Sequence, residues 1–162
     1  MRRNFLVLAV VVMFGAAAGL AAQAKPDFTG KWVWDHTEGV YESPAEAAGA
    51  GAGDRGFTIT QDAKTLTITQ TQGDQTVTAV YNLDGSESKN TVQGRGGATE
   101  RVSKAMWDGA RLVITYTANF GGNAIDRKQT LSLEGGNLVV ETTPPGRGGG
   151  PGTFIKIVYK KG

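Results

Sequence analysis

The residue best suited to acid–base or metal chemistry is His36, which follows Asp35 and is the only histidine of the chain. An imidazole can act as an acid, a base or a metal ligand near neutral pH. Metal sites and catalytic triads need partner side chains, and with no cysteine and no second histidine only carboxylates and hydroxyls could supply them. We therefore predict a solvated loop histidine, and we assign no catalytic residue, no metal ligand and no cofactor.

Pairs of carboxylates are a second possible source of chemistry, because glycosidase-type hydrolysis uses two of them at a defined separation. Sequence spacing between strands does not reveal such a separation, and charged side chains are mostly exposed to solvent. We therefore expect surface carboxylates, and an enzyme that depends on carboxylates or on the histidine is the alternative. The candidates are Asp35, Glu38, Glu42 and Asp54 near the first loop, and Glu100, Asp126 and Glu141 elsewhere.

Two glycine patterns match nucleotide-binding and RNA-binding motifs in their letters only. Residues 51–56, GAGDRG, have the spacing Gly-x-Gly-x-x-Gly. A dinucleotide-binding motif needs a strand before it and a helix after it, whereas here a strand follows. Residues 95–97 and 147–149, both RGG, are single copies without an excess of basic surface residues. We interpret all three as turns or loops and predict no nucleic-acid partner.

The first 24 residues have the layout of a secretory signal peptide. Arg2 and Arg3 precede an apolar run over residues 5–20, and residues 22–24, AQA, form an Ala-x-Ala cleavage site. The alternative is a transmembrane anchor, which would need about 20 apolar residues in a row. We predict cleavage near Ala24 and export from a bacterial cytoplasm to the periplasm or the medium, with no stable membrane anchor afterwards.

The expected mature chain, residues 25–162, is electrically neutral. Loss of Arg2 and Arg3 takes the 17 basic residues to 15, which equals the 15 acidic residues. A neutral chain argues against electrostatic binding to nucleic acid or to an anionic membrane surface. An exported domain without cysteines has no disulfides, so its fold depends on its hydrophobic core. The length suits a single domain.

The elements that must position any site are β-strands. Apolar residues alternate with threonine and other polar residues, which is typical of half-buried antiparallel strands. The expected strands are 27–35, 57–60, 65–69, 76–81, 99–107, 111–119, 127–133, 137–143 and 153–160. We predict an all-β antiparallel up-and-down meander that closes into a barrel of about 8–10 strands, with a sandwich as the alternative. Residues 36–55 and 144–152 are expected to be flexible loops at the barrel mouth.

The opening stretch resembles the Gly-x-Trp signature of the lipocalins and their calycin relatives. Residues 28–32, FTGKW, carry the signature, and residues 59–61, 103–109 and 158–161 resemble later motifs of small exported bacterial proteins described as lipocalin-like. The resemblance implies an up-and-down β-barrel and no settled activity. The chain departs from the lipocalins in one respect, because the arginine that packs over their signature tryptophan, here Trp32, has no certain counterpart; Arg111 and Arg127 are the possible ones.

Aromatic residues on the expected strands are the candidate ligand contacts. They could fill the core of a small barrel, or they could line a cavity for one small apolar molecule. We predict that Trp32 plugs the closed end. The predicted ligand-binding residues are Trp34, Tyr81, Trp107, Tyr116 and Phe120. The favoured function is an exported, non-enzymatic barrel that binds a small apolar molecule. The alternatives are an enzyme at the barrel mouth and a structural or interaction protein of the cell envelope.

Overall fold

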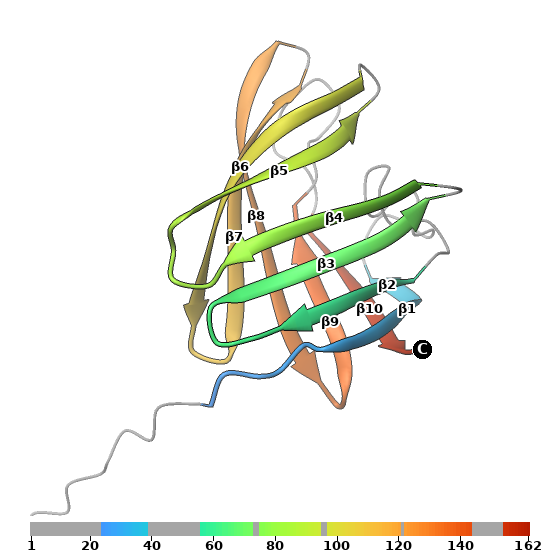
Figure 1. Cartoon of the computed structure of the whole chain (residues 1–162). Coiled ribbons are helices and arrows are strands. Elements are labelled where there is room, and N and C mark those ends of the chain that lie inside the picture. The colour runs from blue at the N-terminus through green and yellow to red at the C-terminus, as the bar shows by residue number, and fades with distance from the viewer. Residues whose placement is uncertain (1–23, 39–55, 73–74, 95–96, 121, 144–153) are drawn as a thin grey trace, which may run out of the picture.

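Ten antiparallel strands make up the part of the chain that the structure describes (Figure 1). The computed structural model describes residues 24–38, 56–72, 75–94, 97–120, 122–143 and 154–162. The strands are β1 (Gly30–Glu38), β2 (Phe57–Gln61), β3 (Thr65–Gln72), β4 (Gln75–Asn82), β5 (Glu87–Gly94), β6 (Gly97–Asp108), β7 (Arg111–Phe120), β8 (Asn123–Glu134), β9 (Asn137–Thr142) and β10 (Ile155–Lys161). Within these ranges no helix is long and apolar enough to cross a membrane.

The strands form one antiparallel sheet that curves into a nearly closed barrel (Figure 1). Each strand pairs with the next from β1 to β4 and from β5 to β10, and β1 also pairs with β10. The sheet order is β4-β3-β2-β1-β10-β9-β8-β7-β6-β5, so β4 and β5 are its two edges. The predicted all-β up-and-down barrel is confirmed, and the two-sheet sandwich is not observed in the described part.

Side chains, rather than a backbone ladder, join the two edges. Buried Asn90 on β5 uses both ends of its amide, because Oδ1 accepts from the Val80 N–H at 2.7 Å and Nδ2 donates to the Val80 carbonyl at 2.9 Å. Ser88 Oγ accepts from the Asn82 N–H at 2.8 Å, and Asn82 Nδ2 donates to the Glu87 carbonyl at 3.0 Å. We call this row of contacts the β4–β5 seam. It satisfies backbone groups that sheet edges otherwise leave unpaired.

Strand β5 is the one strand that the sequence pattern did not predict. Ser88 and Asn90 occupy positions on β5 that are buried but polar. The strand therefore lacks the alternation of apolar and polar residues on which the other strands were assigned. Its inward polar residues are explained by the seam, because they bond to the backbone of β4.

Strand β1 is longer than expected. It continues to Glu38, so residues 36–38 are strand rather than the start of a loop. A β-bulge between Trp34 and His36 shifts the register against β10, and pairing continues beyond it. The rest of that expected loop, residues 39–55, lies outside the described residues, as do the expected loop 144–152 and the leader up to residue 23.

Trp32 is buried in the hydrophobic core, at the end of the barrel that carries the β6–β7 turn and that we call the base. Its side chain is fully buried, and its Nε1 donates to the Phe28 carbonyl at 2.9 Å. Phe28 is also fully buried and comes from the segment that precedes β1. Gln61 on β2 holds that segment in place, because its Oε1 accepts from the Phe28 N–H at 3.1 Å and its Nε2 donates to the Pro26 carbonyl at 3.0 Å.

The side chain that covers Trp32 is Lys161, at the end of β10. Its Nζ lies 4.5 Å from the centroid of the Trp32 ring and donates to the Thr29 carbonyl at 2.6 Å. Gly30 makes room for this lysine, since a Cβ at that position would overlap Lys161 Nζ. The backbone φ of Gly30 is +150°, a conformation that other residues rarely adopt. In the Gly-x-Trp signature, the tryptophan thus supplies the buried ring, and the glycine leaves room for the lysine that packs over that ring.

Neither of the two possible arginines, Arg111 and Arg127, covers Trp32. Arg111 pairs with Asp108 in the β6–β7 turn, with 3.0 Å between Nη2 and Oδ2. Arg127 lies on β8, where its register partner is Tyr116 of β7. The physical reason is the pairing of β1 with β10, which places Lys161 directly opposite Trp32.

Candidate functional site

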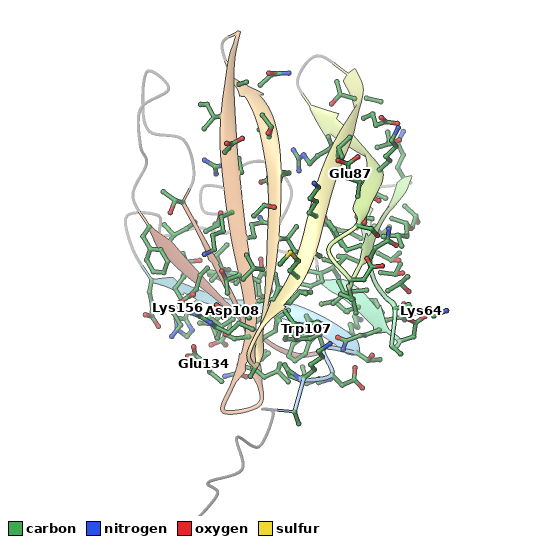
Figure 2. All side chains as sticks on the ribbon, turned by 90° about the vertical axis from the view of Figure 1, so that its left-hand side faces the viewer. Lys64, Glu87, Trp107, Asp108, Glu134 and Lys156 are labelled. Atoms are coloured by element: carbon green, nitrogen blue, oxygen red, sulfur yellow. The ribbon has the colours of Figure 1, made fainter. Side chains whose placement is uncertain are left out.

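Strands β6 and β7 separate along part of their length. Their ladder runs from the β6–β7 turn to the pair Ser103–Tyr116 and stops there. Beyond that pair, residues 97–102 of β6 are paired only with β5, and residues 117–120 of β7 only with β8. Figure 2 shows the two ribbons meeting near Trp107 and diverging towards the opposite end of the barrel. We call this opening the fork, and Ser103–Tyr116 its apex.

A cavity of about 680 Å³ lies in the fork. Its lining combines residues from both faces of the sheet. Ser103 and Tyr116 alternate with outward residues and share the inward face, whereas Val102 and Thr117 face outwards. Both faces can line one cavity because the wall itself is open here. The fork is therefore a lateral opening in the barrel wall.

The carboxylates that line this cavity already have partners. Each belongs to the outward face and is held by a cationic or hydroxyl side chain of the adjacent strand. The pairs are Glu87 Oε1 with Lys104 Nζ at 3.6 Å, Glu100 Oε1 with Lys89 Nζ at 3.7 Å, and Asp126 Oδ1 with the donating Thr117 Oγ1 at 2.8 Å. Lysines therefore balance the charges of Glu87 and Glu100, and Asp126 has a hydrogen-bond donor.

The inward side of the fork carries two arginines. The guanidinium of Arg101 on β6 lies 4.3 Å from the centroid of the Tyr116 ring, which is a cation–π contact across the fork. Arg127 on β8 is the register partner of the same tyrosine. In the part of the chain that the structure describes, neither arginine has a carboxylate within ion-pair distance. Two positive charges therefore face the interior without local compensation.

Ser103 is the unsatisfied polar group of this site. Its side chain is 2% exposed, and its Oγ has no hydrogen-bond partner. A buried hydroxyl without a partner costs about 1–3 kcal/mol, so native proteins rarely keep one. The hydroxyl lies at the apex of the fork and among the lining residues of the cavity.

One of the predicted ligand residues, Tyr116, lines this cavity, whereas Tyr81 does not. Tyr116 forms the apex with Ser103. Tyr81 on β4 is mostly buried, and burial raises the pKa of its hydroxyl, an effect that the charge of Arg101 partly opposes. The structure therefore brings Tyr116 together with Arg101, and it places Tyr81 on β4 outside the lining of the cavity.

The other three predicted ligand residues lie elsewhere. Trp34 is half-buried on β1, and its Nε1 donates to Thr37 Oγ1 at 3.1 Å. Trp107 lies at the base, stacked on Phe28 with 5.8 Å between ring centroids and 7° between ring planes. Phe120 ends β7, and its side chain lies outside the described residues. Trp107 is therefore separated from the fork by the length of the β6–β7 ladder.

His36 lies on the outer surface of β1, away from the cavity. Its Nδ1 is 2.8 Å from Asp35 Oδ2, and its ring is 52% exposed. The hydrogen bond to His36 and a second one to Lys160 lower the pKa of the Asp35 carboxyl. Histidine and carboxylates of the described residues form no cluster that could hold a metal ion. The prediction of a solvated histidine is confirmed, although it lies in a strand rather than a loop.

Sequence reasoning missed Arg101, Ser103 and Arg127 as site residues. The predicted ligand-binding residues were all aromatic, whereas these three are polar residues at inward positions of β6 and β8. The sequence does contain a signal for two of them, because Arg101 and Ser103 lie on the same face of the strand as Ala105 and Trp107. Polar residues that interrupt an apolar inward series indicate a site rather than a core.

Comparison with known proteins supports the fold and leaves the family open. No family model matches the chain, and no curated protein matches it. Solved structures do match, and they include zebrafish ileal bile acid-binding protein complexed with cholic acid. That protein shares 26% identity and has a TM-score of 0.59, with 83% of this chain and 98% of that chain covered.

Two further structures show the same fold at lower identity. The REP1-NXSQ fatty acid transporter is 15% identical, with a TM-score of 0.56 over 83% of this chain and 95% of that chain. Human cRBP IV is 18% identical, with a TM-score of 0.56 over 85% of this chain and 99% of that chain. The class that the fold defines is thus the nearly closed, ten-stranded β-barrel of the calycin type.

Proposed function

We propose that this protein is an exported barrel that binds one small apolar molecule in its interior. The observation that carries the proposal is the opening of the barrel wall onto a cavity of about 680 Å³. Small-molecule sites usually measure about 300–1,000 Å³ and combine apolar walls with a few polar groups. The fork cavity has that size. Its lining is mostly polar, with Ser103, Arg101 and Arg127 on the inward side, so the apolar walls of the site must come from the barrel interior.

Apolar side chains that face the barrel interior above the base supply the contact surface for the ligand. Trp34, Phe57, Ile68 and Val140 pack against the core yet are only partly buried. The register partners of Trp34, Ile68 and Val140 are Tyr159, Ile59 and Ile157, which are buried on the inward face, and Phe57 contacts the Tyr159 ring edge-on. The accessible part of these side chains therefore faces the interior, where an apolar molecule would cover it at a gain of about 25 cal/mol per Å².

The similar solved structures support a ligand of this kind. The zebrafish protein is bound to cholic acid, and a second neighbour is described as a fatty acid transporter. Both molecules are largely apolar and small enough for a single barrel.

The proposal that the protein is exported is based on residues 1–24, which have the layout of a signal peptide. Mass spectrometry of the protein recovered outside the cytoplasm tests this proposal. Cleavage after Ala24 should leave a protein that lacks residues 1–24, and a full-length mass would contradict cleavage.

Titration with decanol, a neutral ten-carbon alcohol, is expected to give saturable binding of one molecule per protein. We expect the intrinsic tryptophan fluorescence to change through Trp34, the half-buried tryptophan above the base. The Trp34→Phe variant should lose most of that change, whereas the matched variant Trp107→Phe, altered at the base, should keep it. Calorimetry measures the binding independently of the fluorescence. Absence of heat and of a fluorescence change for decanol and for the corresponding fatty acid would contradict the proposed function.

A further inference from the structure

The apex of the fork is built to receive a hydrogen-bonding group. Ser103 is one of the residues that line a cavity large enough for a ligand, and its buried Oγ has no hydrogen-bond partner. Tyr116 lies opposite Ser103 on β7, and Arg127 lies opposite Tyr116 on β8. Neighbouring strands of a sheet are about 4.8 Å apart, so the three side chains lie side by side at one level of the wall. Arg101 is the next inward residue of β6 and contacts the Tyr116 ring.

The charges around the apex favour an anionic group. Every carboxylate that lines the cavity belongs to the outward face and is already held by a lysine or a threonine. Arg101 and Arg127 face inwards, and no carboxylate of the described residues pairs with either. A neutral group could satisfy the Ser103 hydroxyl, but it would leave both guanidinium groups uncompensated. Hydrogen bonds between ions are also roughly twice as strong as those between neutral groups.

We propose that the fork is the site for the anionic group of an amphipathic ligand, such as a carboxylate. Ser103 Oγ donates a hydrogen bond to it, Arg101 and Arg127 balance its charge, and the apolar part extends towards Trp34 and Ile68. The cavity is also lined by outward residues, so the anionic group faces solvent through the side of the barrel. This inference rests on the proposed function, because it specifies the chemical class of the same ligand.

Three ten-carbon ligands that differ only in their polar group test the inference by calorimetry at pH 8. Decanoate should bind about tenfold or more tightly than decanol, and decylammonium should bind most weakly. The advantage of decanoate over decanol should shrink as NaCl is added, because salt screens the attraction of the arginines. Arg101→Gln and Ser103→Ala should each remove most of the advantage of decanoate over decanol, which is measured as the ratio of the two affinities within each variant.

The matched control is Arg111→Gln, which removes an equal charge from the exposed β6–β7 turn at the base. It should leave all three affinities unchanged. Ser103→Ala should also unfold at the same denaturant concentration as the original protein or a higher one, because the hydroxyl that it removes has no partner. A loss of decanoate binding in this variant would then not be due to misfolding.

Equal affinity for decanoate and decanol overturns the inference while the proposed function stands. A preference for decanoate that survives both Arg101→Gln and Ser103→Ala also overturns it, because the anionic group would lie elsewhere. Lack of binding by all three ligands contradicts the proposed function itself, and the inference falls with it. A preference that both variants abolish and Arg111→Gln preserves supports the inference.

Discussion

Replacing Trp32 by alanine is expected to lower the free energy of unfolding by about 3–5 kcal/mol, the range for loss of a buried aromatic side chain. The indole is fully buried at the base and donates to the Phe28 carbonyl. Its removal leaves a cavity, an unpaired carbonyl and the uncovered charge of Lys161. Because native domains are stable by only about 5–15 kcal/mol, much of the variant should be unfolded at modest denaturant concentrations. Urea denaturation followed by circular dichroism measures the change.

A pair of phenylalanine variants separates the buried hydrogen bond from simple packing. Trp32→Phe should cost about 1–3 kcal/mol, because the Phe28 carbonyl is left without its buried donor. Trp34→Phe should cost less, since its bond to Thr37 Oγ1 is only partly buried and water can replace the lost donor. Equal costs for the two variants, or a change of less than about 1 kcal/mol for Trp32→Ala, would contradict the structural role of the signature tryptophan.

The second large effect is expected at the β4–β5 seam. Asn90→Leu keeps a side chain of similar size but removes both bonds to the Val80 backbone. We expect a loss of about 2–4 kcal/mol, because a buried N–H and a buried carbonyl both lose their partner. Thr91→Ala, on the neighbouring exposed position of β5, is the control and should change stability by less than about 0.5 kcal/mol.

Hydrogen exchange gives a second measure of the seam. The Val80 amide should exchange faster in Asn90→Leu, whereas amides in the β8–β9 ladder should exchange faster only through the global loss of stability. Faster exchange confined to β4 and β5 would show that side chains hold these two edges together. Unchanged protection of Val80 would mean that the two strands are held by something else.

Most strands could be predicted because each carries its own local signal. On β3, for example, Leu66 and Ile68 alternate with threonines, and the structure places Leu66 in the core. β5 carries no such signal, since Ser88 and Asn90 bond to a strand rather than pack in a core. An alternating apolar pattern indicates burial in a hydrophobic core. The β4–β5 seam buries polar groups, so β5 has no such pattern and could not be predicted from it.

The cover of Trp32 and the fork could not be predicted because both depend on pairing between distant parts of the chain. Lys161 reaches the Thr29 carbonyl across 132 residues of sequence, and only the β1–β10 register brings them together. The fork likewise arises where the β6–β7 ladder ends, which no local motif marks. Tyr116 was predicted from its register with Leu112 and Ile114, and the structure adds Ser103 and Arg101 beside it.

The most direct test of a ligand site in this barrel is a ¹H–¹⁵N NMR titration of the protein with decanoate. We predict that the largest shift changes occur at the apex, in the amides of Ser103 and Tyr116, and at Ile68 on the inner wall. Amides at the base, such as those of Trp32 and Leu138, should change little, and the shifts should saturate at one ligand per protein. Saturating changes confined to the outer surface around His36, with none at the apex, would contradict the account.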